Sequence, residues 1–233
     1  MEAAVRARKN IIVCGGTGAG KTTLVRALAA AIPRTERIVT IEDSLELALD
    51  RAPERHGDVV AMEAREPNVE GEGEITLAEL VRWGLRMSPD RVIVGECRGD
   101  EVLPMLNAMS QGNDGSMCTL HSNSSKGAFG KLAAYAVQAK ERLPLEATNL
   151  LVANALDFVV FIDQDPTTGR RVVASIREVV DADGPLVVSN ETFEPGPNGV
   201  GVYASRLRDE MLRELVHAGL DPSLFDGGTW AVA

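Results

Sequence analysis

The sequence predicts an α/β protein with a mostly parallel central sheet, helices on both faces and a small C-terminal extension. Two observations predict this class. A glycine-rich segment directly follows the apolar run at 10–14, and buried-strand patterns then alternate with amphipathic helix patterns as far as residue 163. With 233 residues and 45% hydrophobic content, the chain has room for one such core and a modest appendage. We expect the core over 1–165 and an extension, a β-hairpin plus a helix, over 166–233.

The core elements follow from hydrophobic periodicity and from turn residues. Apolar, β-branched runs predict strands at 10–14, 37–42, 59–63, 91–94, 116–121 and 158–163. Helical periodicity predicts helices at 21–31, 77–87, 101–109, 125–141 and 144–154, with Pro144 at the start of the last. The charged, glycine-rich stretch 66–74 cannot bury a face and is expected to be an exposed loop. No folded segment is expected before residue 10.

The extension has a different pattern. Alternating residues on either side of the Asp183-Gly184-Pro185 turn predict antiparallel strands at 171–181 and 186–193. A proline- and glycine-rich loop at 194–199 and a closing helix at 206–218 complete the chain.

The segment GGTGAGKT at 15–22 fits the phosphate-binding pattern G-x-x-x-x-G-K-[ST] and lies between a strand and a helix, as that loop must. Gly15, Gly18 and Gly20 let the backbone curl so that N–H groups point at phosphate oxygens. Lys21 is expected to contact the β- and γ-phosphates, and the Thr22 hydroxyl to bind Mg²⁺. The residues expected to hold the nucleotide are Gly15, Gly16, Thr17, Gly18, Ala19, Gly20, Lys21, Thr22 and Thr23. The sequence therefore predicts a protein that binds a nucleoside triphosphate with Mg²⁺.

Acidic residues at strand ends predict the second half of the site. The strand at 91–94 runs into Glu96, which resembles a Walker B acid, with Glu where Asp is usual, and could hold Mg²⁺ through water. Glu42 ends a neighbouring strand and is the leading candidate for the base that orients the attacking water. Asp43 and Glu46 are the alternatives for that role.

Composition limits the partners. The chain has 24 basic and 34 acidic residues, a net charge of −10, which opposes a nucleic-acid groove because phosphate backbones need clustered cations. Aromatic residues make up 4%, too few for base-stacking platforms. No run of about 18 apolar residues is present to span a membrane. The three cysteines fit no zinc spacing, and we expect reduced core thiols in a cytosolic protein.

Taken in order, these segments resemble the type II/IV secretion ATPase superfamily (secretion system protein E family), and most closely its CpaF/TadA-like pilus-assembly branch. Besides the phosphate loop, the stretches that carry the resemblance are 41–47 (its acidic box), 65–76, 85–99 (Walker B) and 112–121 (its histidine box). The sequence departs from the family at Asn113, where His is usual, and at Ser88, where a basic residue is common.

The resemblance implies a RecA-like fold that hydrolyses ATP. It implies that His121 senses the γ-phosphate. Arg98 directly follows the Walker B strand, and this position makes it the candidate to stabilise transition-state charge, in its own or a neighbouring subunit. Arg65, Arg86 and Arg91 are weaker candidates for that charge. It also implies that the N-terminal domain of family members is absent from this chain.

The expected function is therefore an ATP-driven motor for pilin assembly or substrate export. The resemblance implies a hexameric ring, inner-membrane platform proteins as partners and a cytoplasmic, membrane-peripheral location, with no direct nucleic-acid partner. A conjugative DNA-transfer ATPase of the same superfamily is the main alternative. A P-loop kinase is disfavoured because no arginine-rich lid is evident, and a nucleotide-gated assembly switch remains open.

Overall fold

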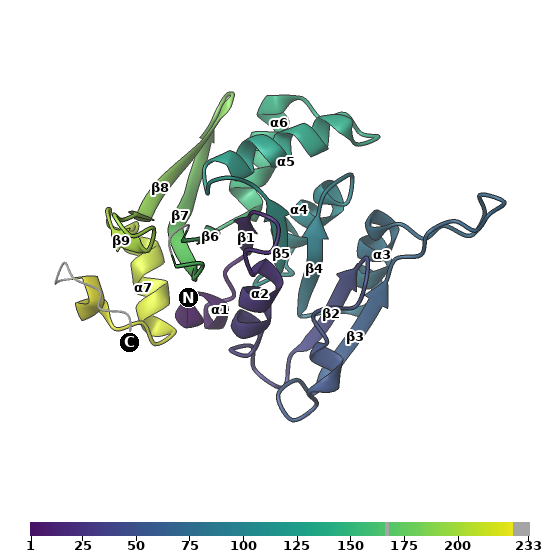
Figure 1. Cartoon of the computed structure of the whole chain (residues 1–233), viewed down its shortest axis with the longest axis horizontal. Coiled ribbons are helices and arrows are strands. Elements are labelled where there is room, and N and C mark those ends of the chain that lie inside the picture. The colour runs from purple at the N-terminus through teal and green to yellow at the C-terminus, as the bar shows by residue number, and fades with distance from the viewer. Residues whose placement is uncertain (166–167, 226–233) are drawn as a thin grey trace.

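One continuous sheet organises the chain (Figure 1). The computed structural model describes residues 1–165 and 168–225. Within them, nine strands pair in the order β3-β2-β4-β5-β1-β6-β7-β8-β9. The pairs from β3 to β6 are parallel, and those from β6 to β9 are antiparallel. The strands are β1 Ile11–Gly15, β2 Arg37–Glu42, β3 Asp58–Glu63, β4 Arg91–Cys97, β5 Met117–His121, β6 Phe158–Gln164, β7 Arg171–Asp183, β8 Leu186–Pro195 and β9 Gly201–Tyr203.

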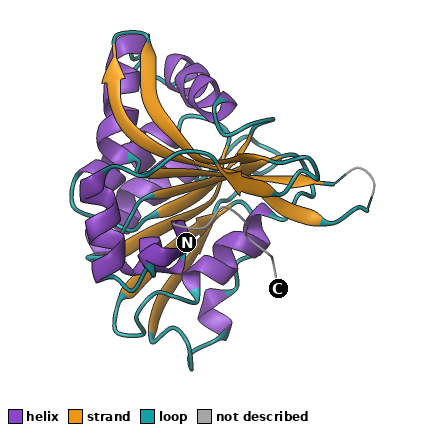
Figure 2. Cartoon of the chain, turned by 90° about the vertical axis from the view of Figure 1, so that its left-hand side faces the viewer, coloured by secondary structure: helices purple, strands orange, loops and turns teal. Residues whose placement is uncertain are grey.

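Helices cover both faces of the sheet, as expected, because neighbouring strand residues point to opposite sides (Figure 2). Ile12 of β1 belongs to the core formed with α3, α4, α5 and α6, whereas Ile11 belongs to the core formed with α1, α2 and α7. The helices are α1 Glu2–Arg6, α2 Lys21–Ala29, α3 Leu77–Gly84, α4 Val102–Ser110, α5 Gly127–Gln138, α6 Leu145–Ala155 and α7 Asp209–His217, with 3₁₀ turns at Leu49–Arg51, Leu85–Met87 and Pro222–Phe225. The predicted α/β class is confirmed.

Sequence patterns missed α1 and β9, and they ended the strand that carries Glu96 too early. The prediction that nothing folds before residue 10 is wrong, because α1 buries Ala3, Ala4 and Val5 against the core. β9 was also not predicted, and three residues are too few to show alternation. β4 continues to Cys97, so that Glu96 lies within the strand rather than after it.

The antiparallel strands predicted at 171–181 and 186–193 are present as β7 and β8. They continue the central sheet, because β7 pairs with β6 from Phe158↔Glu178 to Gln164↔Arg171. The predicted loop at 66–74 is exposed, and the bridge between Arg65 and Ile75 closes its base.

The three cysteines are buried and unpaired, as the sequence predicted. In the part of the chain that the structure describes, no helix combines the length and apolar character that a bilayer crossing requires.

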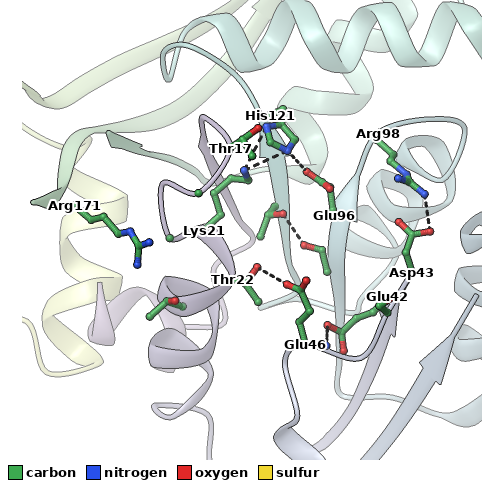
Figure 3. Close-up of a pocket in the computed structure, with 16 residues that line it drawn as sticks. Thr17, Lys21, Thr22, Glu42, Asp43, Glu46, Glu96, Arg98, His121 and Arg171 are labelled. Atoms are coloured by element: carbon green, nitrogen blue, oxygen red, sulfur yellow. Dashed lines mark hydrogen bonds and ion pairs between the residues drawn. The ribbon is translucent and has the colours of Figure 1, made fainter. Parts of the chain in front are cut away.

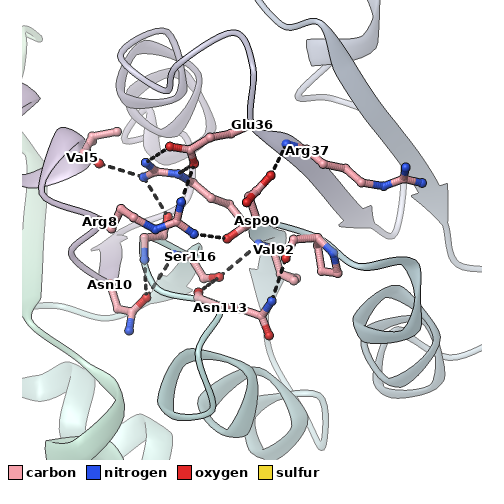
Figure 4. Close-up of polar contacts among 12 residues, drawn as sticks. Val5, Arg8, Asn10, Glu36, Arg37, Asp90, Val92, Asn113 and Ser116 are labelled. Atoms are coloured by element: carbon pink, nitrogen blue, oxygen red, sulfur yellow. Dashed lines mark hydrogen bonds and ion pairs between the residues drawn. The ribbon is translucent and has the colours of Figure 1, made fainter.

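A cluster of polar contacts around Glu36 and Arg8 connects the N-terminal ends of the parallel strands (Figure 4). Arg91 begins β4 and is completely buried. Its Nε and Nη2 donate to Glu36 at 2.6 and 3.1 Å, and its Nη1 donates to the Val5 carbonyl at 2.8 Å. Arg8 also pairs with Glu36, at 3.1 Å. The proposed role of Arg91 at transition-state charge is therefore wrong, since the side chain is enclosed in this cluster.

We expect Arg91→Met to lower the free energy of unfolding by about 3–5 kcal/mol, because the substitution removes one partner of a buried ion pair. Urea denaturation measures this loss. Arg37→Ala is the matched control, because Arg37 pairs with Asp58 at 3.3 Å on the surface, where such a pair contributes about 0–1 kcal/mol. An Arg91→Met loss no larger than that of Arg37→Ala would contradict this account.

Candidate nucleotide-binding site

The phosphate loop has the backbone geometry that its glycines predict. β1 ends at Gly15, and α2 begins at Lys21. Gly18 and Gly20 have φ values of 71° and 98°, in the left-handed region that glycine adopts most readily. A Cβ on Gly15 would collide with the carbonyl oxygen of Ile162 in β6. The loop therefore passes closely over the end of the sheet and leads into the N-terminus of α2, a favourable place for an anion.

Lys21 lies against this loop. Its Nζ donates to the carbonyl oxygens of Gly15 and Gly16 at 3.3 and 3.0 Å. The residue is 9% exposed. Burial lowers the pKa of its ammonium, and the charge of Glu96 opposes this shift. Phosphate oxygens would offer this buried cation charged acceptors, which form stronger hydrogen bonds than carbonyl groups do.

A cavity of about 510 Å³ opens beside the loop (Figure 3). Residues from the phosphate loop and from the ends of β2, β4 and β5 line it, together with Arg171 of β7: they are Thr17, Gly18, Gly20, Lys21, Thr22, Thr23, Glu42, Asp43, Ser44, Glu46, Gly95, Glu96, Arg98, Thr119, His121 and Arg171. The site thus lies at the carboxyl ends of parallel strands, where open α/β sheets bind ligands. Arg65 and Arg86, the weaker arginine candidates, do not line it.

Glu96 and His121 lie close to Lys21, beside the phosphate loop (Figure 3). The Oε1 atom of Glu96 lies 2.7 Å from His121 Nε2. The two ring nitrogens of His121 lie 3.4 and 3.5 Å from Lys21 Nζ. The structure therefore brings together Glu96 of β4, His121 of β5 and Lys21 of α2, which the sequence analysis predicted as separate site residues. A phosphate that attracted Lys21 would also alter the contact between His121 and Glu96.

Glu42, at the end of β2, is 3% exposed. Its Oε1 accepts hydrogen bonds from the backbone N–H groups of Glu46 and Leu47 at 3.0 and 2.9 Å. Its Oε2 is enclosed and has no hydrogen-bond partner among the described residues. Burial is the main cause of the raised pKa of this carboxyl. An enclosed carboxylate oxygen without a partner is costly, and a role in the reaction is one explanation of such a group.

Gly95 on β4 makes room for Glu42. A Cβ at Gly95 would lie 2.8 Å from the Glu42 Cγ. Any larger residue at this position would displace the carboxylate.

The two rival acids have different neighbours. The Oε2 atom of Glu46 accepts a hydrogen bond from the Thr22 hydroxyl at 3.4 Å, so Glu46 lies beside the expected Mg²⁺ ligand. Asp43 forms an ion pair with Arg98 at 2.9 Å. Arg98 is thus held by an acid of the same chain, and its side chain is 57% exposed.

The oxygen donors near the phosphate loop suit Mg²⁺ that is held mainly by a nucleotide and water, rather than a metal ion held by protein side chains alone. Within residues 1–165 and 168–225, no cluster of three or more His, Cys, Asp or Glu side chains is placed to hold a metal ion. Mg²⁺ in nucleotide sites takes few protein ligands and relies on phosphate oxygens and water. The Thr22 hydroxyl, with the carboxylates of Glu46 and Glu96 nearby, fits that arrangement.

Arg171 is a pocket residue that sequence reasoning missed. It was assigned only as the start of an antiparallel strand, about 150 residues from the phosphate loop. The pairing of β7 with β6 brings it to the site, since β6 also pairs with β1, which leads into the loop. No local sequence signal marks this position.

Comparison with known proteins identifies the family. Residues 1–184 match the model of the family described as type II/IV secretion system protein. A putative conjugal transfer protein of Mycobacterium tuberculosis is 42% identical over 180 residues, covering 77% of this chain and 49% of that protein. The type IV secretion system protein PtlH of Bordetella pertussis is 38% identical over 180 residues, covering 76% of this chain and 50% of PtlH.

A solved structure is similar to this chain and supports the same family. The VirB11 ATPase of the Brucella suis type IV secretion system, in complex with sulphate, is similar with a TM-score of 0.66 and 33% identity, covering 75% of this chain and 49% of that one. The chain spans about half the length of the curated relatives it matches. The family predicted from the sequence is confirmed: the chain belongs to the type II/IV secretion system protein family.

Proposed function

We propose that this chain is the nucleotide-hydrolysing part of a motor that drives pilin assembly or substrate export. The observation that carries the proposal is one cavity, lined by a phosphate loop on one side and by Glu42, Glu96 and His121 on the other. A binding loop alone would hold a nucleotide, whereas acids at the far side of the cavity supply what hydrolysis also needs.

The phosphate loop and Lys21 hold the triphosphate. The N–H groups of the loop and the N-terminus of α2 are the donors, and Lys21 exchanges its two carbonyl acceptors for β- and γ-phosphate oxygens. Thr22 contributes its hydroxyl to Mg²⁺, and Glu96 assists through water. Bound Mg²⁺ would neutralise charge on the phosphate oxygens during in-line attack of water.

Glu42 is the proposed base that orients that water. Its raised pKa favours accepting a proton, and its Oε2 is not committed to any described group. The two amides at Oε1 fix the carboxylate in place. Oε2 is enclosed in this conformation, so the proposal requires a rearrangement that brings it to the attacking water.

His121 and Arg98 connect hydrolysis to motion in this proposal. His121 lies between Lys21 and Glu96, so loss of the γ-phosphate changes the charge beside it. Arg98 would leave Asp43 to approach developing charge in its own or a neighbouring subunit. A hexameric ring at the inner face of the membrane would convert the difference in binding energy between its ATP and ADP states into movement of platform proteins.

A conjugative DNA-transfer motor is the second candidate, because the M. tuberculosis relative is named a putative conjugal transfer protein. The net charge of −10 opposes direct DNA contact. Phosphate release measured with and without DNA separates the two candidates, and we expect no stimulation. Phosphate release without any acceptor molecule also separates hydrolysis from a kinase reaction.

A further inference from the structure

Arg171 lines the cavity, and the reaction proposed above gives it no role. It is the first residue of β7, held in the sheet by pairing with Gln164. Its side chain is exposed, and its guanidinium forms no hydrogen bond or ion pair with any part of the chain that the structure describes (Figure 3). Arg98, the other arginine of the cavity, is by contrast paired with Asp43.

The stem of Arg171 packs against the phosphate loop. Its Cδ lies 3.0 Å, and its Nε 3.7 Å, from the position that a Cβ on Gly20 would take. Gly20 is the N-cap of α2 and has φ of 98°. Glycine at this position therefore allows the positive φ of the loop and leaves room for the Arg171 side chain.

The position of Arg171 also indicates which end of the nucleotide it meets. Figure 3 shows Arg171 on one side of Lys21 and Thr22, with Glu96 and Asp43 on the other. The γ-phosphate must lie toward the acids, since water attacks it there. The opposite side of the loop, where Arg171 lies, is then the side of the α-phosphate and the nucleoside.

We infer that Arg171 binds the α-phosphate of the nucleotide, an inference that rests on the proposed nucleotide-hydrolysing function. A guanidinium is a permanent cation whose paired N–H donors match two phosphate oxygens. The α-phosphate is common to ATP and ADP, so Arg171 contributes equally to the binding of both. It therefore differs from an arginine that contacts the transferred phosphate, which would distinguish ATP from ADP.

The test is isothermal titration of Arg171→Ala with ADP and with ATP in the presence of Mg²⁺. We expect the Kd of both nucleotides to rise by the same factor, about 10- to 100-fold, as for loss of hydrogen bonds to a charged group. Arg171→Lys should recover part of this loss, because an ammonium keeps the charge. Arg170→Ala is the matched control, because this neighbouring arginine is exposed and does not line the cavity. The Kd values of this variant for ADP and ATP should stay within about twofold of wild type.

Two results would overturn the inference. Equal affinities of Arg171→Ala and Arg170→Ala would show that Arg171 does not bind the nucleotide. A loss for ATP without one for ADP would place Arg171 at the γ-phosphate. If the wild-type chain bound neither nucleotide, the proposed function itself would fail; if it bound both and only Lys21→Ala weakened binding, the inference alone would fail.

Discussion

Lys21→Ala is expected to reduce the affinity for ATP by about 100-fold, or about 2.7 kcal/mol, and to abolish turnover. Lys21 is the cation of the phosphate loop, and its ammonium already lies 3.0 Å from the Gly16 carbonyl. Alanine removes the charge and its hydrogen bonds while leaving the loop backbone in place. Titration with ATP, and phosphate release at saturating ATP, measure the two effects.

Lys131→Ala is the matched control, because it removes the same charge from an exposed position on α5 that does not line the cavity. It should leave both quantities unchanged. Unaltered ATP affinity in folded Lys21→Ala protein would mean that the nucleotide does not bind at this loop.

Glu42→Gln is expected to bind ATP normally and to lose turnover by about 100- to 1,000-fold, as for removal of a general base. Glutamine keeps the shape of the side chain and an oxygen that accepts the amides of Glu46 and Leu47. The lost property is the ability to accept a proton. Single-turnover hydrolysis, measured beside ATP affinity, separates this effect from a binding defect.

Glu46→Gln is the informative comparison, since Glu46 contacts Thr22 and is the rival base. We expect its turnover to fall less than that of Glu42→Gln. Normal hydrolysis by Glu42→Gln, together with loss in Glu46→Gln, would move the role of base to Glu46 and leave Glu42 as the residue that holds the 43–47 segment.

Much of this architecture was predictable because its signals are local. The parallel strands are continuous apolar runs buried on both faces, and the phosphate loop has a fixed spacing of glycines and lysine. The acids followed from the same logic, since carboxyl ends of parallel strands meet at one edge. Glu42 and Glu96 do line one cavity with Lys21.

The remaining features depend on tertiary contacts that no local pattern encodes. α1 has five residues, fewer than two helical turns, so the sequence shows no repeat of apolar positions there, and the helix is fixed by burial of Val5. Arg91 has the sequence context of a surface arginine at the start of a strand, but the fold encloses it with Glu36. Arg171 reaches the site only through the β6–β7 pairing. The burial of Glu42 depends on the absence of a side chain at Gly95.

The most direct test of the account is phosphate release from ATP and Mg²⁺, read beside light-scattering mass over a range of protein concentrations, with Lys21→Ala as the blank. The account predicts turnover per subunit that rises as a hexamer forms and that is absent from Lys21→Ala. A hexamer that binds ATP tightly, yet releases no more phosphate than Lys21→Ala, would contradict it and identify a nucleotide-gated assembly switch.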